Sequence, residues 1–388
     1  MSRVETYQGH ATAEVVIIGG GVIGLTVARA LALRGVRDVL LIDRSSLGTE
    51  SSYAAGGILA PQAEADRADE FFELACQSRD LYPTFAAALL DETGTDIELD
   101  TTGTLYLALS EKDEEEIEQR YEWQQRAGLT LEKLSAEEAQ KLEPRIAATV
   151  RGALLFPLDI QVENRRLLTA LIAANEKLGV SLISGTNVES MRLQNGRVAG
   201  VETARGFVST RRVVVASGAW ASLLSSSEGS DSRMPRVRIE PVRGQMLCFA
   251  AQPPLVRHVI YSPRGYLVPR HDGRLLAGST TEHAGYARQV TASGMHAILS
   301  NALDLAPALG SLPLIDSWSG LRPRAQDDWP VLGPSEIEGL FYATGHYRNG
   351  ILLAPITGEL IAEAIASRVI SSLLSRFSPH RFDLAHVF

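Results

Sequence analysis

The chain has 388 residues, 45% of them hydrophobic and 21% charged, and carries a formal net charge of −9. This composition is typical of a globular protein with two domains, and the acidic balance argues against a uniformly basic nucleic-acid-binding surface. The two cysteines, Cys76 and Cys248, have neither CxxC nor metal-ligand spacing, so we expect no disulfide framework, no metal site and a cytoplasmic location.

A βαβ unit is the first pattern along the chain. Residues 14–18 (EVVII) indicate a buried strand, an apolar segment with helical periodicity reaches Arg34, and residues 39–42 (VLLI) indicate a second buried strand. Gly35 supplies the helix stop. Glycines and Arg29 interrupt the apolar stretch, and it lacks a basic segment with a cleavage site. We therefore expect neither a signal peptide nor a membrane span.

Gly19, Gly21 and Gly24 form a GxGxxG motif between this strand and this helix. Such glycines allow a tight turn, the approach of a pyrophosphate, and close packing of the helix on the strand. Asp43 ends the second strand about 20 residues further on, where an acid can accept hydrogen bonds from a ribose. The strand, the glycines, the helix and the acid together predict a dinucleotide-binding site.

Two features favour FAD over NAD as this dinucleotide. The motif lies near the N-terminus, and no second copy appears downstream. Residues 340–354 (LFYATGHYRNGILLA) predict a strand, a glycine-punctuated turn and the start of a helix. The N–H groups and dipole of that helix can stabilise an anionic reduced flavin. An NAD enzyme stays open as an alternative at this point.

Five segments together carry a resemblance to a known family. They are residues 15–25 (VVIIGGGVIGL), 51–60 (SSYAAGGILA), 213–221 (VVVASGAWA), 319–324 (SGLRPR) and 344–355 (TGHYRNGILLAP). On these segments the chain resembles the FAD-dependent D-amino-acid oxidase superfamily, and most closely the glycine oxidases of the thiamine pathway. The similarity extends over nearly the whole chain.

The resemblance implies an α/β fold in which two domains are interleaved. Residues 13–87, 158–232 and 323–388 are expected to form a Rossmann-type FAD-binding domain. Residues 88–157 and 233–322 are expected to form an α+β substrate domain, built on an antiparallel sheet that roofs the active site. Relatives of this type also imply a homo-oligomer, specifically a homotetramer.

The same resemblance implies which residues contact FAD. The cofactor should be non-covalent, because the covalent-flavin cysteine of sarcosine oxidase relatives has no evident counterpart. Expected contacts are Gly19, Gly21, Val22, Ile23 and Gly24 around the pyrophosphate, Asp43 and Arg44 at the adenosine ribose, Val188 at the adenine, Ser51 and Ser52 at phosphate, Gly56, Gly57 and Ile58 at the flavin ring, and His346, Tyr347, Arg348, Asn349, Gly350, Ile351 and Leu352 at its pyrimidine end.

A substrate-carboxylate site is implied as well. Arg322 matches an arginine that clamps the carboxylate, for which a guanidinium fork is suited. Tyr266 matches a tyrosine that touches the same carboxylate, and Arg348 matches a third contact near the flavin. We assign no catalytic proton abstractor, because positioning and the cofactor's own chemistry account for the reaction.

Two substrate-side positions depart from the glycine oxidase pattern. Arg264 stands where the pattern has histidine, and Thr281 stands where it has methionine. Arg264 can extend outward to solvent or reach inward to a second anionic group on the substrate. We therefore expect a glycine-like amine, which includes N-substituted glycines and need not be glycine itself.

The activity implied by the resemblance is that of an FAD-dependent amine oxidase. A hydride would pass from the α-carbon of glycine or an N-substituted glycine to flavin N5, giving an imine and then an oxo acid with ammonia or an amine. O₂ would be reduced to H₂O₂. One alternative is a flavin dehydrogenase of a related secondary amine that uses a carrier instead of O₂. Another is a non-catalytic flavin-binding protein, in which a carboxylate clamp would have no purpose.

Overall fold

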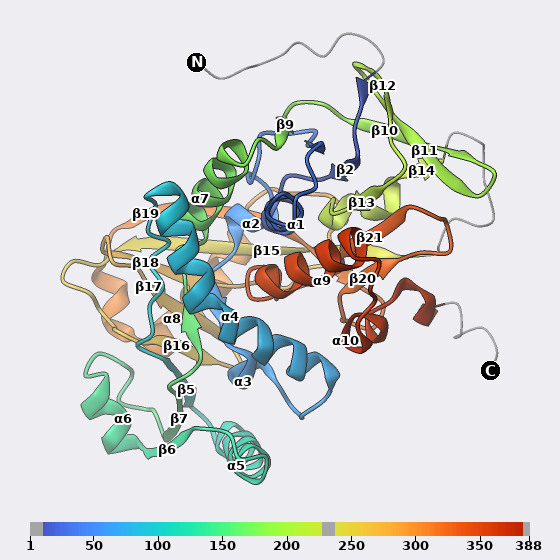
Figure 1. Cartoon of the computed structure of the whole chain (residues 1–388). Coiled ribbons are helices and arrows are strands. Elements are labelled where there is room, and N and C mark those ends of the chain that lie inside the picture. The colour runs from blue at the N-terminus through green and yellow to red at the C-terminus, as the bar shows by residue number, and fades with distance from the viewer. Residues whose placement is uncertain (1–10, 227–236, 383–388) are drawn as a thin grey trace.

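A six-stranded sheet forms the core of one half of the computed structural model, which describes residues 11–226 and 237–382 (Figure 1). All of its neighbouring strands are parallel except β20 and β21, which are antiparallel. Both faces of the sheet are covered, which explains why these strands are apolar runs without alternation. In spatial order the strands are β20 (Val331–Pro334), β21 (Leu340–Thr344), β13 (Val213–Val215), β2 (Val15–Ile18), β3 (Val39–Ile42) and β9 (Ser181–Ile183).

Helices cover one face of this sheet, and a second sheet covers the other. On the helical face α1 packs against α7 and α9, and α4 packs against the same two helices (Figure 1). The helices are α1 (Val22–Leu33), α4 (Glu70–Thr93), α7 (Asn164–Lys177) and α9 (Ala354–Ala366). The covering sheet runs in the order β1 (Ala11–Thr12), β12 (Gly206–Ser209), β11 (Arg197–Thr203), β10 (Val188–Gln194) and β14 (Ser225–Ser226).

An eight-stranded sheet forms the other half of the molecule. Its neighbouring strands are antiparallel except β16 and β5, which are parallel. Helices α5 (Glu111–Arg126), α6 (Ala136–Leu142) and α8 (Ala292–Leu305) pack on it. In order the strands are β19 (Leu314–Ala325), β15 (Ile239–Ala250), β18 (Arg274–Gly278), β17 (Gly265–Pro269), β16 (Val259–Ser262), β5 (Thr104–Ala108), β7 (Gly152–Phe156) and β6 (Glu132–Ser135).

Two separate parts of the chain build the eight-stranded sheet, one over residues 104–156 and one over residues 239–325. The expected α/β fold class, with a Rossmann-type half and an antiparallel half, is confirmed. Strand β19 runs continuously past the expected boundary at residue 322. The boundary between residues 232 and 233 lies outside the described residues, and the division into domains stays a proposal.

Strands β4 (Ile58–Leu59) and β8 (Ile160–Gln161) form a separate two-stranded antiparallel sheet. None of the described helices is long and apolar enough to cross a membrane. The remaining elements are α2 (Ser51–Ala54), α3 (Pro61–Glu64), α10 (Ser372–Arg376) and the 3₁₀ helices η1 (Gly218–Leu223), η2 (Pro307–Ser311) and η3 (Pro379–Phe382).

Helix α1 sits directly on the turn that follows β2. A Cβ added to Gly24 would lie 1.9 Å from the carbonyl oxygen of Gly19. Gly19 itself has φ +114°, and its added Cβ would lie 2.4 Å from the carbonyl oxygen of Ala216. Only glycine fits both positions without moving backbone, so these two residues set the distance between helix and sheet.

Replacing Gly24 with alanine should lower the free energy of unfolding by about 3 kcal/mol, because backbone must move to relieve the contact. Gly35→Ala is the matched control: its Cβ would meet nothing within 4 Å, and only its positive φ of +83° opposes a side chain. That cost should be about 1 kcal/mol. Urea unfolding of both variants measures the difference. Equal losses would show that α1 does not depend on this close approach.

Candidate active site

A cavity of about 430 Å³ lies between the two halves of the molecule. Its floor is the carboxyl end of the parallel strands, marked by Ile18 of β2, Ile42 of β3 and Thr344 of β21. Its roof is the eight-stranded sheet, from which Tyr266 of β17 and Arg322 of β19 line it. Ligands of open α/β sheets bind at this edge, so the topology alone makes the cavity the candidate site.

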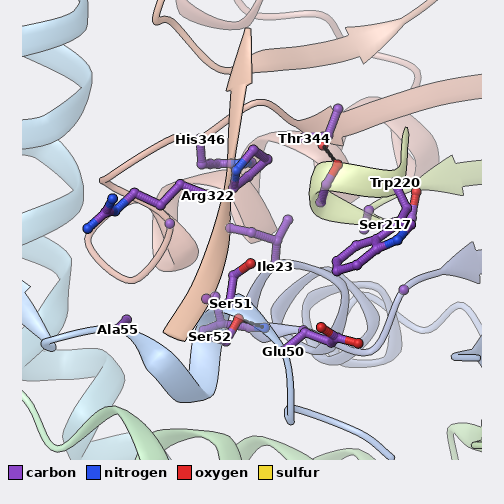
Figure 2. Close-up of a pocket in the computed structure, with 18 of the residues that line it drawn as sticks. Ile23, Glu50, Ser51, Ser52, Ala55, Ser217, Trp220, Arg322, Thr344 and His346 are labelled. Atoms are coloured by element: carbon purple, nitrogen blue, oxygen red, sulfur yellow. Dashed lines mark hydrogen bonds between the residues drawn. The ribbon is translucent and has the colours of Figure 1, made fainter. Parts of the chain in front are cut away.

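The N-terminus of α1 faces the floor of the cavity. Its N-cap residue, Gly21, has no side chain to cap the helix, and its first turn contains no acidic residue. Ser52 accepts a hydrogen bond from the Val22 amide at 3.0 Å, and Figure 2 shows Ser51 and Ser52 beside Ile23 at this end of the helix. Unpaired amides and the positive end of a helix dipole attract a phosphate, so the arrangement fits a pyrophosphate group.

Asp43 lies at the end of β3 and is held by backbone. Its carboxylate accepts the Gly20 amide at 2.6 Å and the Ser45 amide at 2.7 Å. Burial raises the pKa of Asp43, while these two hydrogen bonds oppose that rise. An ionised carboxylate has about four acceptor positions, so it keeps capacity for ribose hydroxyls.

Next to Asp43, the Arg44 guanidinium lies 3.7 Å from the centre of the Trp220 ring and pairs with Glu50 at 3.2 Å. All three of these side chains line the cavity, and Trp220 and Glu50 were not predicted as site residues. Trp220 follows β13 within the segment 213–221 that carries the family resemblance, and this position was the only sequence signal that it belongs to the site. The stacked ring and guanidinium give this end of the cavity a flat wall.

After α2, two adjacent glycines present backbone without side chains to the cavity, between the lining residues Ala55 and Ile58. Gly57 has φ +70°, and its added Cβ would lie 2.1 Å from the carbonyl oxygen of Val162. A Cβ on Gly56 would lie 3.4 Å from the ring of Tyr266. Both glycines line the cavity, so a flat ring system can approach the chain closely here.

Arg322 reaches the cavity from β19, and Figure 2 shows it at the opposite end of the view from Trp220. Its Nη1 donates to the carbonyl oxygen of Thr280 at 3.0 Å, and its Nη2 donates to the hydroxyl of Ser279 at 2.7 Å. An added Cβ on Gly244 would lie 2.3 Å from Nη2, so the guanidinium occupies the space that this glycine leaves. Within residues 11–226 and 237–382, Arg322 forms no salt bridge.

Tyr266 stands close to this arginine. Strand pairing places it opposite Gly278, next to the serine that holds Arg322. The buried Tyr266 hydroxyl donates to the sulfur of Met246 at 3.3 Å. A thioether is a weak acceptor, so this hydroxyl can turn to a stronger acceptor such as a carboxylate.

Arg348 differs from Arg322 because an acid already balances its charge. Its Nη2 donates to the Tyr261 hydroxyl at 2.9 Å and lies 3.5 Å from Oε1 of Glu64. The Tyr261 hydroxyl donates to the same carboxylate at 3.0 Å. The Glu64 carboxylate raises the pKa of Arg348. Sequence reasoning missed Glu64, and its position just after the matched segment 51–60 was the only signal for it.

The structure brings most of the predicted residues together. Unpredicted neighbours in the cavity include Ser217, Gly244 and Met246. The predicted residues that line it are Gly19, Gly21, Val22, Ile23, Asp43, Arg44, Ser51, Ser52, Gly56, Gly57, Ile58, Val188, Tyr266, Arg322, His346, Tyr347, Arg348, Gly350 and Ile351.

Five predicted residues are not among the described residues that line the cavity. Arg264 points outward: its side chain is 40% exposed, and its Nη1 lies 3.3 Å from Asp304 of α8. Thr281 is exposed in the loop after β18. Gly24 packs against Gly19, and the other two are Asn349 and the buried core residue Leu352.

His346 is buried in the glycine-containing turn that follows β21. Its Nε2 is 3.0 Å from the Thr357 hydroxyl, and burial lowers the pKa of His346 to about 3. The imidazole is therefore neutral at physiological pH. A charge on this ring cannot be what stabilises an anion in the cavity.

This burial should make the folded chain sensitive to acid. The unfolded chain binds a proton at His346 near pH 6.5, whereas the folded chain binds it only near pH 3, so stability falls as the pH drops through that window. Between pH 7.5 and pH 5, the free energy of unfolding should fall by about 2 kcal/mol through His346. His346→Gln should remove this loss, while the exposed control His296→Gln should not. Unfolding curves at pH 7.5 and 5 test this, and an unchanged loss in His346→Gln would contradict it.

Comparisons with known proteins show the family of the chain. Residues 14–364 match the family of FAD dependent oxidoreductases. Glycine oxidase of Geobacillus kaustophilus is 36% identical over 369 residues, covering 94% of this chain and 96% of that protein. A crystal structure of that species' glycine oxidase superposes with a TM-score of 0.89 at 34% identity, covering 96% of this chain and 99% of the other.

Two further relatives differ in name or length. The bifunctional protein ThiO/ThiG of Trichormus variabilis is 36% identical over 385 residues, which are 96% of this chain but 55% of that protein, so the chain spans about half its length. Iminodiacetate oxidase of Chelativorans sp. BNC1 superposes with a TM-score of 0.83 at 27% identity, covering 94% and 99% of the two chains. The chain belongs to the family of FAD dependent oxidoreductases, and FAD is its cofactor.

Proposed function

We propose that this protein oxidises glycine or an N-substituted glycine, with the substrate carboxylate bound by Arg322. The observation that carries the proposal is the charge of Arg322 in the cavity wall, which is held by a carbonyl and a hydroxyl. No acid among the described residues pairs with it. A guanidinium held by neutral acceptors favours an anionic ligand, and a planar carboxylate fits its fork.

The donors of Arg322 leave room for such a ligand. A guanidinium has five N–H groups, and the contacts with Thr280 and Ser279 use two of them. The remaining three can bind both oxygens of one carboxylate. The Tyr266 hydroxyl, once it leaves Met246, supplies another donor to the same group.

Binding the carboxylate at Arg322 fixes the α-carbon near the part of the cavity formed by Gly56 and Gly57. When bound there, the flavin supplies the hydride acceptor. We assign no proton abstractor: Glu64 accepts the Tyr261 hydroxyl and pairs with Arg348, so its charge is already balanced. The residues of this chain orient the substrate.

Several finer points belong to the same proposal. FAD is held non-covalently, with residues 13–87, 158–232 and 323–388 as its domain, and O₂ is the electron acceptor that yields H₂O₂. The name ThiO/ThiG of one relative supports a role in thiamine biosynthesis. The family resemblance supports a cytoplasmic homotetramer. Oxygen consumption measured with and without an artificial carrier separates an oxidase from a dehydrogenase.

Replacing Arg322 with leucine should lower kcat/KM for glycine or sarcosine by about ten- to a hundred-fold, mainly through KM, because a charged hydrogen bond is lost. Gly244→Ala keeps the arginine but displaces its Nη2, so it should raise KM as well. Arg324→Leu is the control on the same strand, since Arg324 pairs with Asp328. If both Arg322→Leu and Gly244→Ala kept the wild-type KM, the substrate carboxylate would not be bound by Arg322.

The substrate range should follow from the outward direction of Arg264. With this guanidinium near Asp304, no second anion is recognised at that position, so glycine, sarcosine and N-ethylglycine should be better substrates than iminodiacetate. H₂O₂ release measured over this panel gives the ranking. Arg264→His should leave the ranking unchanged. A preference for iminodiacetate that disappears in Arg264→His would show that the side chain turns inward.

A further inference from the structure

Arg270 is a buried cation that touches the cavity wall without lining the cavity. It follows β17, and its side chain is 2% exposed. Its Nη2 donates to the carbonyl oxygen of Gly56 at 2.8 Å. An added Cβ on Gly57 would lie 2.9 Å from the same nitrogen. The guanidinium therefore packs directly against the two glycines that face the cavity.

The other contacts of Arg270 fix it in place. Its Nη1 donates to the carbonyl oxygen of Val162 at 2.7 Å and to the side chain of Gln161 at 3.1 Å. Its Nη2 also donates to Oδ1 of Asn164 at 3.2 Å. The four Nη hydrogens thus all reach neutral acceptors. The Val162 amide in turn donates to the carbonyl oxygen of Gly57 at 2.9 Å. The carbonyl oxygens of both glycines are therefore held by one hydrogen-bonded frame, which consists of Arg270 and the Val162 backbone.

Asn164 extends this frame toward α2. Its Nδ2 donates to the carbonyl oxygens of Ser52 at 2.8 Å and Tyr53 at 3.1 Å. Together, Arg270 and Asn164 bind the carbonyl oxygens of three residues between Ser52 and Gly56. The backbone that leads from the phosphate-side serines to the two glycines is therefore held from one side by a single hydrogen-bonded pair.

The charge of Arg270 has no hydrogen-bonded acid to balance it. Its Nε is buried without a partner in the described chain, and the nearest carboxylate oxygen, on Glu163, is 4.0 Å away. Glu163 also caps α7 and lies 3.5 Å from Arg274. Burial lowers the pKa of Arg270 to about 10, so it stays charged at neutral pH. Burying such a charge lowers the free energy of unfolding because the charge loses its hydration. This cost argues for a role of Arg270 beyond packing.

We propose that Arg270 is a positioning residue for the flavin. It orients the peptides of Gly56 and Gly57 against the flavin ring and places a fixed positive charge behind them, which makes the bound FAD easier to reduce. This inference rests on the proposed position of the ring beside these glycines. It does not depend on which amine is the substrate.

The experiment uses the FAD-loaded protein and two variants, Arg270→Gln and Arg270→Lys, with Arg274→Gln as the control. Sulfite is the probe, because it adds to electron-poor flavins and bleaches their visible absorbance. Arg270→Gln should weaken sulfite binding about tenfold, which is the effect of one charge removed from a poorly screened interior. Arg270→Lys keeps the charge and should stay within about threefold of wild type. The control should bind sulfite as wild type does.

The affinity for FAD supplies the second measurement. Lysine donates from one atom and cannot reach both Gly56 and Val162, so Arg270→Lys should lose about tenfold in FAD affinity. Wild-type sulfite binding in a folded Arg270→Gln, or equal sulfite losses in both variants, would overturn the electrostatic role. Wild-type FAD affinity in Arg270→Lys would overturn the positioning role, even where Arg270→Gln fails to fold. Neither measurement needs an amine, so a failed substrate panel leaves both results intact.

Discussion

The close approach of α1 to the turn after β2 is the constraint on which the rest of the molecule depends. Two glycines set this distance, because an added Cβ on Gly24 would lie 1.9 Å from the Gly19 carbonyl oxygen. It puts the positive end of α1 at the carboxyl edge of the sheet. Helices α7 and α9 then pack on α1. One backbone contact thereby places both the phosphate-binding end and the helical layer.

Charge balance distinguishes the three arginines around the cavity. Arg348 is balanced by Glu64, which makes it part of the wall. Arg322 and Arg270 both donate their hydrogen bonds to neutral acceptors, but Glu163 lies 4.0 Å from Nε of Arg270. Arg322 lines the cavity, whereas Arg270 lies behind the cavity wall and donates to the carbonyl oxygen of Gly56. This difference supports the two proposed roles, a ligand-binding charge for Arg322 and a positioning charge for Arg270.

The sequence predicts the parts of the site that lie within one local motif. The strand, the glycine turn, the helix and Asp43 follow from periodicity and spacing, because each depends on neighbours within about 30 residues. Gly244 and Met246 were missed, because their roles arise only when β15 pairs with β18 and β19. Likewise, alignment to a family pattern could not give the direction of Arg264, which depends on Asp304 of α8.

The central claim is that the charge of Arg322 binds the carboxylate of the substrate. The most direct measurement is a titration of the FAD-loaded protein with glycolate, a carboxylate without an amine, followed by the change in the flavin absorption spectrum. The account predicts saturable binding to the wild type and a loss of about tenfold or more in affinity in Arg322→Leu. Glycolate binding of equal affinity in the two proteins would contradict it.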